Sequence, residues 1–146
     1  MVKFKKPIAG KLVDIAEASD QTFKQKMLGP GFSIIPKSNL LTAPVAGVIE
    51  MIYPTKHAFS IKYGDNQFLL IHMGVDYHVN EQTFFLNFRL NDRVSIGDPL
   101  VEINLPLFIK QTKYPEIYFT FIEAKELEII GQENENKQEV LLLNIW

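Results

Sequence analysis

The chain has 146 residues, of which 47% are hydrophobic and 22% charged, so it is long enough to fold as one domain with a substantial core. Its 15 basic and 17 acidic residues are interspersed and give a net charge of -2, which leaves no basic stripe for nucleic acid or anionic lipid. Cysteine is absent and neither a long apolar run nor a secretory signal is found, so we expect a cytoplasmic protein without disulfides, membrane insertion or nucleic-acid binding.

Short apolar or alternating runs recur between Gly, Pro, Asn and Asp along most of the chain, a pattern typical of an all-β sandwich or barrel. In chain order the expected strands are 10–15, 31–36, 40–43, 47–53, 58–62, 67–73, 93–96, 100–104, 117–121 and 139–145. Asp20 can cap a helix over residues 21–28, and Pro106 can begin a helical turn that reaches Lys110. The polar segment 132–137 is expected to be an exposed loop. We therefore predict an antiparallel β-sandwich or barrel with one or two short helices.

Two histidines, His57 and His72, lie in apolar, β-favouring sequence, where a buried imidazole needs a partner. A turn over residues 63–66 separates their segments, and a hairpin centred near residue 64 or 65 pairs position 57 with position 72. Cross-strand neighbours on one face of a sheet lie roughly 4.5 to 5.5 Å apart at Cβ. We therefore expect the two imidazoles to reach the same ligand atom.

Two imidazoles without a cysteine suit three kinds of chemistry. They can bind a metal ion with a carboxylate such as Asp76 or Glu50, or act as an acid and a base. They can also transfer a phosphoryl group, one nitrogen attacking while the other donates to the phosphoryl oxygens. A metallopeptidase of related β architecture needs a His-x-His pair, which the chain lacks. The residues by themselves leave the three possibilities open.

The segments around the histidines resemble those of a known family. Residues 55–61 (TKHAFSI) and 70–76 (LIHMGVD) are similar to the paired-histidine signature of glucose-type enzyme IIA domains of the bacterial phosphoenolpyruvate-dependent sugar phosphotransferase system. Residues 23–34, 43–47 and 94–101 are similar to further family segments in the same order. The resemblance covers roughly residues 7–107 and implies a single enzyme IIA domain over residues 1–146.

The resemblance implies a phosphocarrier. His72 matches the histidine that accepts a phosphoryl group from phospho-HPr, and His57 matches the imidazole that stabilises this group. Thr55 and Asp76 match a hydroxyl and a carboxylate near the site. The phosphoryl group then passes to a cysteine of an enzyme IIB partner, a separate chain or complex associated with the membrane through IIC, and this transfer supports sugar uptake.

The resemblance also implies how partners bind. No cofactor and no metal ligand set belongs to the predicted site. The alternative function is a regulatory module that keeps the IIA surface and binds its partners according to phosphorylation state, with reduced transfer activity. The apolar rim predicted to dock partners consists of Phe23, Leu28, Tyr53, Leu70 and Met73.

Overall fold

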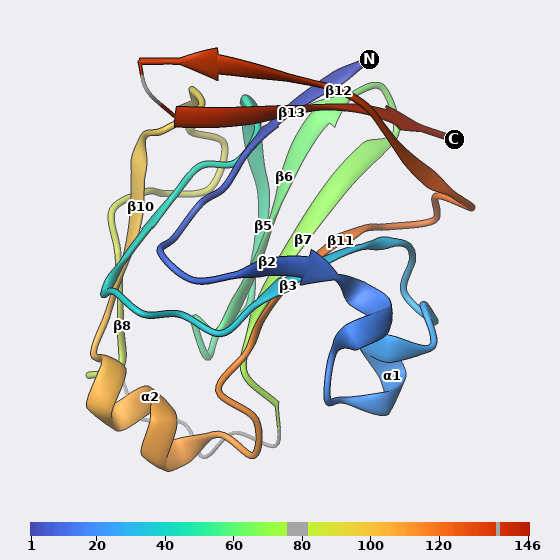
Figure 1. Ribbon diagram of the computed structural model, residues 1–146. Coiled ribbons are helices and arrows are strands. Elements are labelled where there is room, and N and C mark those ends of the chain that lie inside the picture. The colour runs from blue at the N-terminus through green and yellow to red at the C-terminus, as the bar shows by residue number, and fades with distance from the viewer. Residues whose placement is uncertain (76–81, 137) are drawn as a thin grey trace.

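The computed structural model describes residues 1–75, 82–136 and 138–146 (Figure 1). Strands predominate, with two α-helices, α1 (Gln21–Lys24) and α2 (Leu105–Gln111), and one 3₁₀ turn, η1 (Ile15–Glu17). The strands are β1 (Val2–Lys5), β2 (Leu12–Asp14), β3 (Gly31–Ile34), β4 (Leu40–Thr42), β5 (Gly47–Ile52), β6 (Ala58–Gly64), β7 (Gln67–Met73), β8 (Phe84–Leu86), β9 (Arg93–Val94), β10 (Pro99–Ile103), β11 (Ile117–Phe121), β12 (Leu127–Glu135) and β13 (Gln138–Ile145).

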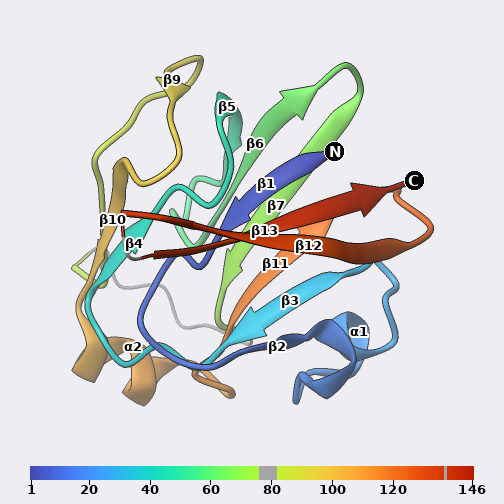
Figure 2. The ribbon, with the colours of Figure 1, turned by 45° about the horizontal axis from the view of Figure 1, so that its top comes forward.

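The described strands form three sheets in which the paired strands are antiparallel. One sheet has seven strands in the order β2-β3-β11-β7-β6-β5-β9, and the other two have the orders β1-β13-β12 and β4-β10-β8. Figure 2 shows the sheet β1-β13-β12 lying across the seven-stranded sheet, and in Figure 1 the helices α1 and α2 lie in the lower half of the view, below β12 and β13. The predicted fold class, an antiparallel β-sandwich with short helices, is confirmed.

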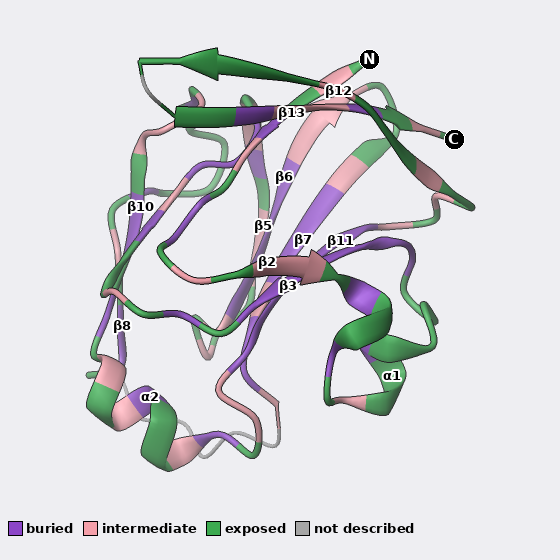
Figure 3. Ribbon diagram, viewed as in Figure 1, coloured by how far each residue is buried: buried purple, intermediate pink, exposed green. Residues whose placement is uncertain are grey.

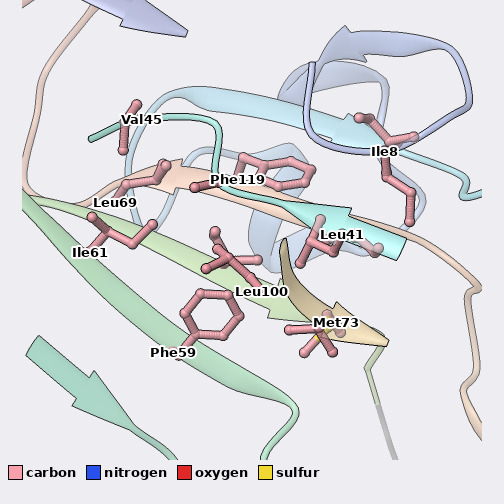
Figure 4. Close-up of a cluster of buried hydrophobic side chains, with 14 of the residues drawn as sticks. Ile8, Leu41, Val45, Phe59, Ile61, Leu69, Met73, Leu100 and Phe119 are labelled. Carbon is pink, nitrogen blue, oxygen red and sulfur yellow. The ribbon is translucent and has the colours of Figure 1, made fainter. Parts of the chain in front are cut away.

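The core lies between the sheets. Leu69, Ile71 and Met73 alternate along β7 and are fully buried, and they share one cluster with Leu41 of β4 and Leu100 of β10. Figure 4 shows side chains of this cluster, among them Leu69, Met73, Leu41 and Leu100, and Figure 3 shows β7 and β11 as largely buried strands. Burying one large apolar side chain contributes about 1.5 to 3 kcal/mol, so this inner face supplies much of the stability of the fold.

Each predicted strand corresponds to an observed one, while β1, β8 and β12 were not predicted. The predicted loop at residues 132–137 is wrong, because residues 132–135 belong to β12 and pair with β13. Strand β12 is at the edge of its sheet, and its residues 132–135 are all polar and exposed, so this part of the strand shows no alternation. Lys137 lies outside the described residues.

The helices begin where the sequence predicted, but their lengths differ. The Asp20 carboxylate accepts the Phe23 N–H and caps α1, as expected, yet the helix ends at Lys24 because Lys26 adopts a left-handed φ of 58°. Asn104 caps α2 in the same way and Pro106 lies in its first turn. Within the described residues, no helix has the length and apolarity needed to cross a bilayer.

Candidate active site

His72 projects from the outer face of β7, opposite to the core. Since successive residues of a strand point to opposite faces, Leu70 and His72 share the face away from Ile71. Ala58 of β6 and Tyr118 of β11 are the direct cross-strand partners of His72. The small Ala58 side chain leaves space beside the His72 ring, and that space is where the second imidazole lies.

His57 reaches this space from just outside β6. The predicted pairing of His57 with His72 is wrong by one residue. The hairpin turns at Asp65 and Asn66, one position later than predicted, and an irregularity between Lys62 and Gly64 offsets only part of that shift, so Ala58 pairs with His72. The His57 carbonyl accepts the Met73 N–H at 2.7 Å, and Lys56 before it has a left-handed φ of 64°. The two imidazole centroids are nevertheless 4.9 Å apart, with their planes at 83°. The expected proximity of the two rings is therefore confirmed, although the route to it differs.

The surroundings of His72 keep its ring neutral. Burial, and next the nearby His57, lower the pKa of His72 to about 4, against weaker opposing effects of the Gly74 backbone and the Asp20 carboxylate. Its Nδ1 atom is buried and has no partner at normal hydrogen-bonding geometry. Because a group bonded to the ring needs access, Nε2 is the nitrogen of His72 through which an external reagent can react.

His57 is oriented by its neighbours. The Thr55 hydroxyl forms a hydrogen bond with Nδ1 of His57, so these two predicted site residues lie together. The edge of the Tyr53 ring meets the imidazole with centroids 5.6 Å apart and planes at 69°. Burial lowers the pKa of His57, so this ring also favours its neutral form near pH 7.

Two aromatic rings close the other side of His72. Phe23 of α1 lies 5.2 Å from the His72 ring and stacks on Tyr118 at 4.0 Å with an interplanar angle of 1°. Both rings are buried in a second apolar cluster with Ile15 and Ala18. His72 thus lies in a slot between His57 on one side and the stacked pair of Phe23 and Tyr118 on the other.

The predicted docking rim is only partly at the surface. Leu28 and Tyr53 are 39% and 37% exposed, as a rim requires. Met73 is fully buried in the main core, so its placement on the rim is wrong: it lies one residue after His72 and therefore points to the inner face. Phe23 and Leu70 are also buried, at 4% and 6% exposure, and contribute to the walls beneath the rim.

Of the predicted site residues, Asp76 lies outside the described residues. Tyr118 and Glu116, which hydrogen-bond to each other beside His72, were missed by the sequence reasoning, because only the pairing of β11 with β7 brings them there. Among residues 1–75, 82–136 and 138–146, no three side chains of the His, Cys, Asp and Glu types group as metal ligands.

The fold and the site together define a β-sandwich protein that presents a pair of neutral imidazoles on one face of its largest sheet. Residues 2–127 match the family described as phosphoenolpyruvate-dependent sugar phosphotransferase system, EIIA 1, and the chain belongs to this family. The resemblance noted from the histidine motifs is thereby confirmed, as is the class of phosphotransferase-system component.

Relatives and a solved structure support the same family assignment. The chain is 43% identical over 102 residues to the glucose-specific EIIA component of Halalkalibacterium halodurans, which covers 69% of this chain and 59% of the relative. It is 35% identical over 136 residues to the glucose-specific EIICBA component of Staphylococcus carnosus, which covers 90% of this chain but 20% of the relative. The chain therefore matches only part of these two proteins. The structure of glucose permease IIA from Mycoplasma capricolum superposes with a TM-score of 0.74 at 34% identity, covering 95% of this chain and 94% of that one.

Proposed function

We propose that the chain is a phosphocarrier that accepts a phosphoryl group from phospho-HPr on Nε2 of His72 and passes it to a cysteine of an enzyme IIB partner. The observation that carries this proposal is the neutral His72 ring, with its Nδ1 buried, held 4.9 Å from a second imidazole. The printed names of the relatives, glucose-specific EIIA component, support the same function.

The acceptor residue supplies an electron pair. In the tautomer with its proton on Nδ1, the lone pair of Nε2 of His72 attacks phosphorus as the nitrogen–phosphorus bond of phospho-HPr breaks, and the donor imidazole keeps the released pair. A pKa of about 4 leaves this lone pair unprotonated near pH 7, so no base is needed. The donor ring carries a proton on its other nitrogen and leaves as a neutral imidazole, while the His72 ring keeps its Nδ1 proton and takes over the positive charge, so the transfer balances.

The second imidazole stabilises the charge that is transferred. When the Thr55 hydroxyl donates to Nδ1 of His57, the ring proton is on Nε2 and can be donated to a phosphoryl oxygen. A donor fixed in place before the reaction requires no reorganisation, which is why such groups are effective in a partly dry site. His57 is therefore assigned to stabilising the transition state, with Thr55 as the residue that fixes its tautomer.

Partner docking completes the proposal. Leu28 and Tyr53, the exposed members of the predicted rim, supply apolar contacts for HPr and IIB. Asp76 is retained as a site carboxylate on the family resemblance alone. We also propose that residues 1–146 act as one IIA domain in the cytoplasm, with a IIB partner held at the membrane through IIC. No observation on the described residues favours the alternative, a regulatory module with reduced transfer.

The test is incubation with phosphoenolpyruvate, enzyme I and HPr from the same organism, followed by intact mass. We expect the gain of one phosphoryl group that is stable in base and lost in acid, as a phosphoramidate is. His72→Gln, in the same mixture, serves as the control that excludes labelling elsewhere. An unchanged mass of the wild-type protein, with HPr shown to be phosphorylated, would remove the phosphocarrier function.

A further inference from the structure

A buried polar network lies directly beside the candidate acceptor. Tyr118 is the cross-strand partner of His72, and its hydroxyl donates to Oε1 of Glu116 at 2.9 Å. The two Glu116 carboxylate oxygens also accept the Ser19 N–H, at 3.1 and 3.2 Å. Tyr118 and Glu116 are 0% and 5% exposed, so the network is closed off from solvent.

The network joins the short helix α1 to the sheet that carries His72. Ser19 immediately precedes Asp20, the residue that caps α1, so the hydrogen bond from its backbone to Glu116 fixes the start of the helix next to the beginning of β11. Ring contacts hold the helix in the same place. Phe23 of α1 stacks flat on the Tyr118 ring, and both rings lie against His72, at 5.2 and 6.3 Å between centroids.

The composition of the network is costly for a purely structural role. A helix of four residues has little stability of its own, and a buried carboxylate lowers the free energy of unfolding unless its hydrogen bonds are made. Apolar side chains at positions 116 and 118 could fill the same space without that cost. The arrangement does, however, give the Tyr118 ring one orientation, which packing alone does not enforce.

Resting on the proposed phosphocarrier function, we propose that Glu116 and Tyr118 are positioning residues: anchored to α1 through Ser19 and Phe23, they fix the orientation of the His72 ring and keep water from its buried edge. They do not contact the partner, because both lie beneath the surface. Loss of the network is therefore expected to lower the rate of transfer and to leave the affinity for HPr unchanged.

The protonation of His72 reports on this role independently of transfer. The titratable groups around His72 are His57 before β6, Asp20 at the start of α1, and Tyr118 of β11 with its partner Glu116. Of these, His57 and Asp20 act on the pKa of His72. Burial is the largest cause of its lowered pKa. If α1 loosens and water enters, the pKa of His72 must rise toward its ordinary value of 6.5.

The experiment compares Tyr118→Phe, which removes only the anchoring hydroxyl, with Phe23→Leu, which removes the stack from the other end. Tyr63→Phe is the matched control, since Tyr63 is half-buried and packs on Phe121 in the main core. Each folded variant is titrated by NMR at the His72 ring and assayed for HPr-dependent labelling at several HPr concentrations.

We expect Tyr118→Phe and Phe23→Leu to raise the pKa of His72 by about one unit and to slow labelling about tenfold at saturating HPr, without changing the half-saturating HPr concentration. The control should change none of these. An unchanged His72 pKa in both variants, with the fold intact, would overturn the positioning role, and so would an effect on half-saturation alone. If the wild type is not labelled at all, the phosphocarrier function fails, and the NMR titration still decides on positioning.

Discussion

The two faces of the seven-stranded sheet differ in what their side chains do. On the inner face, Ile71 and its neighbours Leu69 and Met73 are fully buried and purely apolar. On the outer face of the same strand, His72 lies against His57 and the rings of Phe23 and Tyr118, and the Tyr118 hydroxyl donates to Glu116. The comparison indicates that the inward residues of β7 stabilise the fold, whereas His72 on its outward face carries the chemistry. A change on one face should therefore have little effect on the role of the other.

The largest effect expected from the outer face is that of His72→Gln. This change removes the acceptor nitrogen, so labelling by phospho-HPr should be abolished completely, as intact mass will show. Thermal unfolding should remain within a few degrees of the wild type, because Nδ1 of His72 contributes no hydrogen bond of normal geometry. Unfolding of this variant would mean that the outer face also carries the fold.

Ile71→Ala is the matching change on the inner face, one residue away. Removing a fully buried isoleucine side chain should lower the free energy of unfolding by about 2 to 5 kcal/mol, measured in urea. The rate of labelling per folded molecule should stay close to that of the wild type. A loss of transfer that exceeds the loss of folded protein would show that the two faces are coupled.

His57→Gln tests the division of labour within the site. The acceptor remains, but a positioned donor to the phosphoryl oxygens is lost, which typically raises a barrier by about 2 to 4 kcal/mol. Labelling kinetics should therefore be slower by a factor of about 10² to 10³. Wild-type kinetics in this variant would contradict the assignment of His57 to the transition state, whatever the distance between the rings.

The pH dependence of stability should carry a contribution from His72. The folded protein binds this proton with a pKa of about 4 and the unfolded chain with an ordinary pKa of 6.5, so the unfolded chain binds more protons between these values. The contribution is fully present above about pH 6.5 and is lost as the pH falls toward 4, at a cost on the order of 3 kcal/mol. Urea unfolding of the wild type and of His72→Gln at both ends of this pH range isolates the contribution of His72. Equal pH dependence in the two proteins would argue against the lowered pKa.

The smallest effect concerns the rim. Leu28 is 39% exposed, so Leu28→Asp need not bury its carboxylate and should change the free energy of unfolding by only about 0.5 kcal/mol. The HPr concentration for half-maximal labelling should rise about tenfold, because an apolar docking contact is replaced by a charge. A stable variant with normal half-saturation would show that HPr docks elsewhere, and Met73→Leu, a conservative core change, is the control that should leave half-saturation unaltered.

Local patterns in the sequence predicted most of the fold, and long-range pairing determined the rest. Short apolar runs identified β7 and β11, and the Asp20 cap identified the start of α1, since these signals lie within a few residues. Strand β12 was mistaken for a loop in part because an exposed edge strand has no buried face to produce alternation.

For the site as well, local patterns predicted one part and long-range pairing determined the rest. The histidine pair was evident from a hairpin, although its register was wrong by one residue, because the turn lies at residues 65 and 66, one position later than predicted. Met73 was placed on the rim although alternation from His72 already put it in the core. Tyr118 was missed because its contact with His72 depends on a strand pairing that is distant in the sequence.

The central claim, that the outer face of β7 presents Nε2 of His72 as the phosphoryl acceptor, is tested most directly by locating the phosphoryl group on a nitrogen. The protein labelled with ¹⁵N in its histidines is phosphorylated by HPr, and the ring nitrogens are examined by NMR through their couplings to ring protons and phosphorus. The structure predicts one substituted ring, that of His72, with phosphorus on Nε2, since Nδ1 is buried. Phosphorus on Nδ1 of His72, or on either nitrogen of His57, would contradict the account.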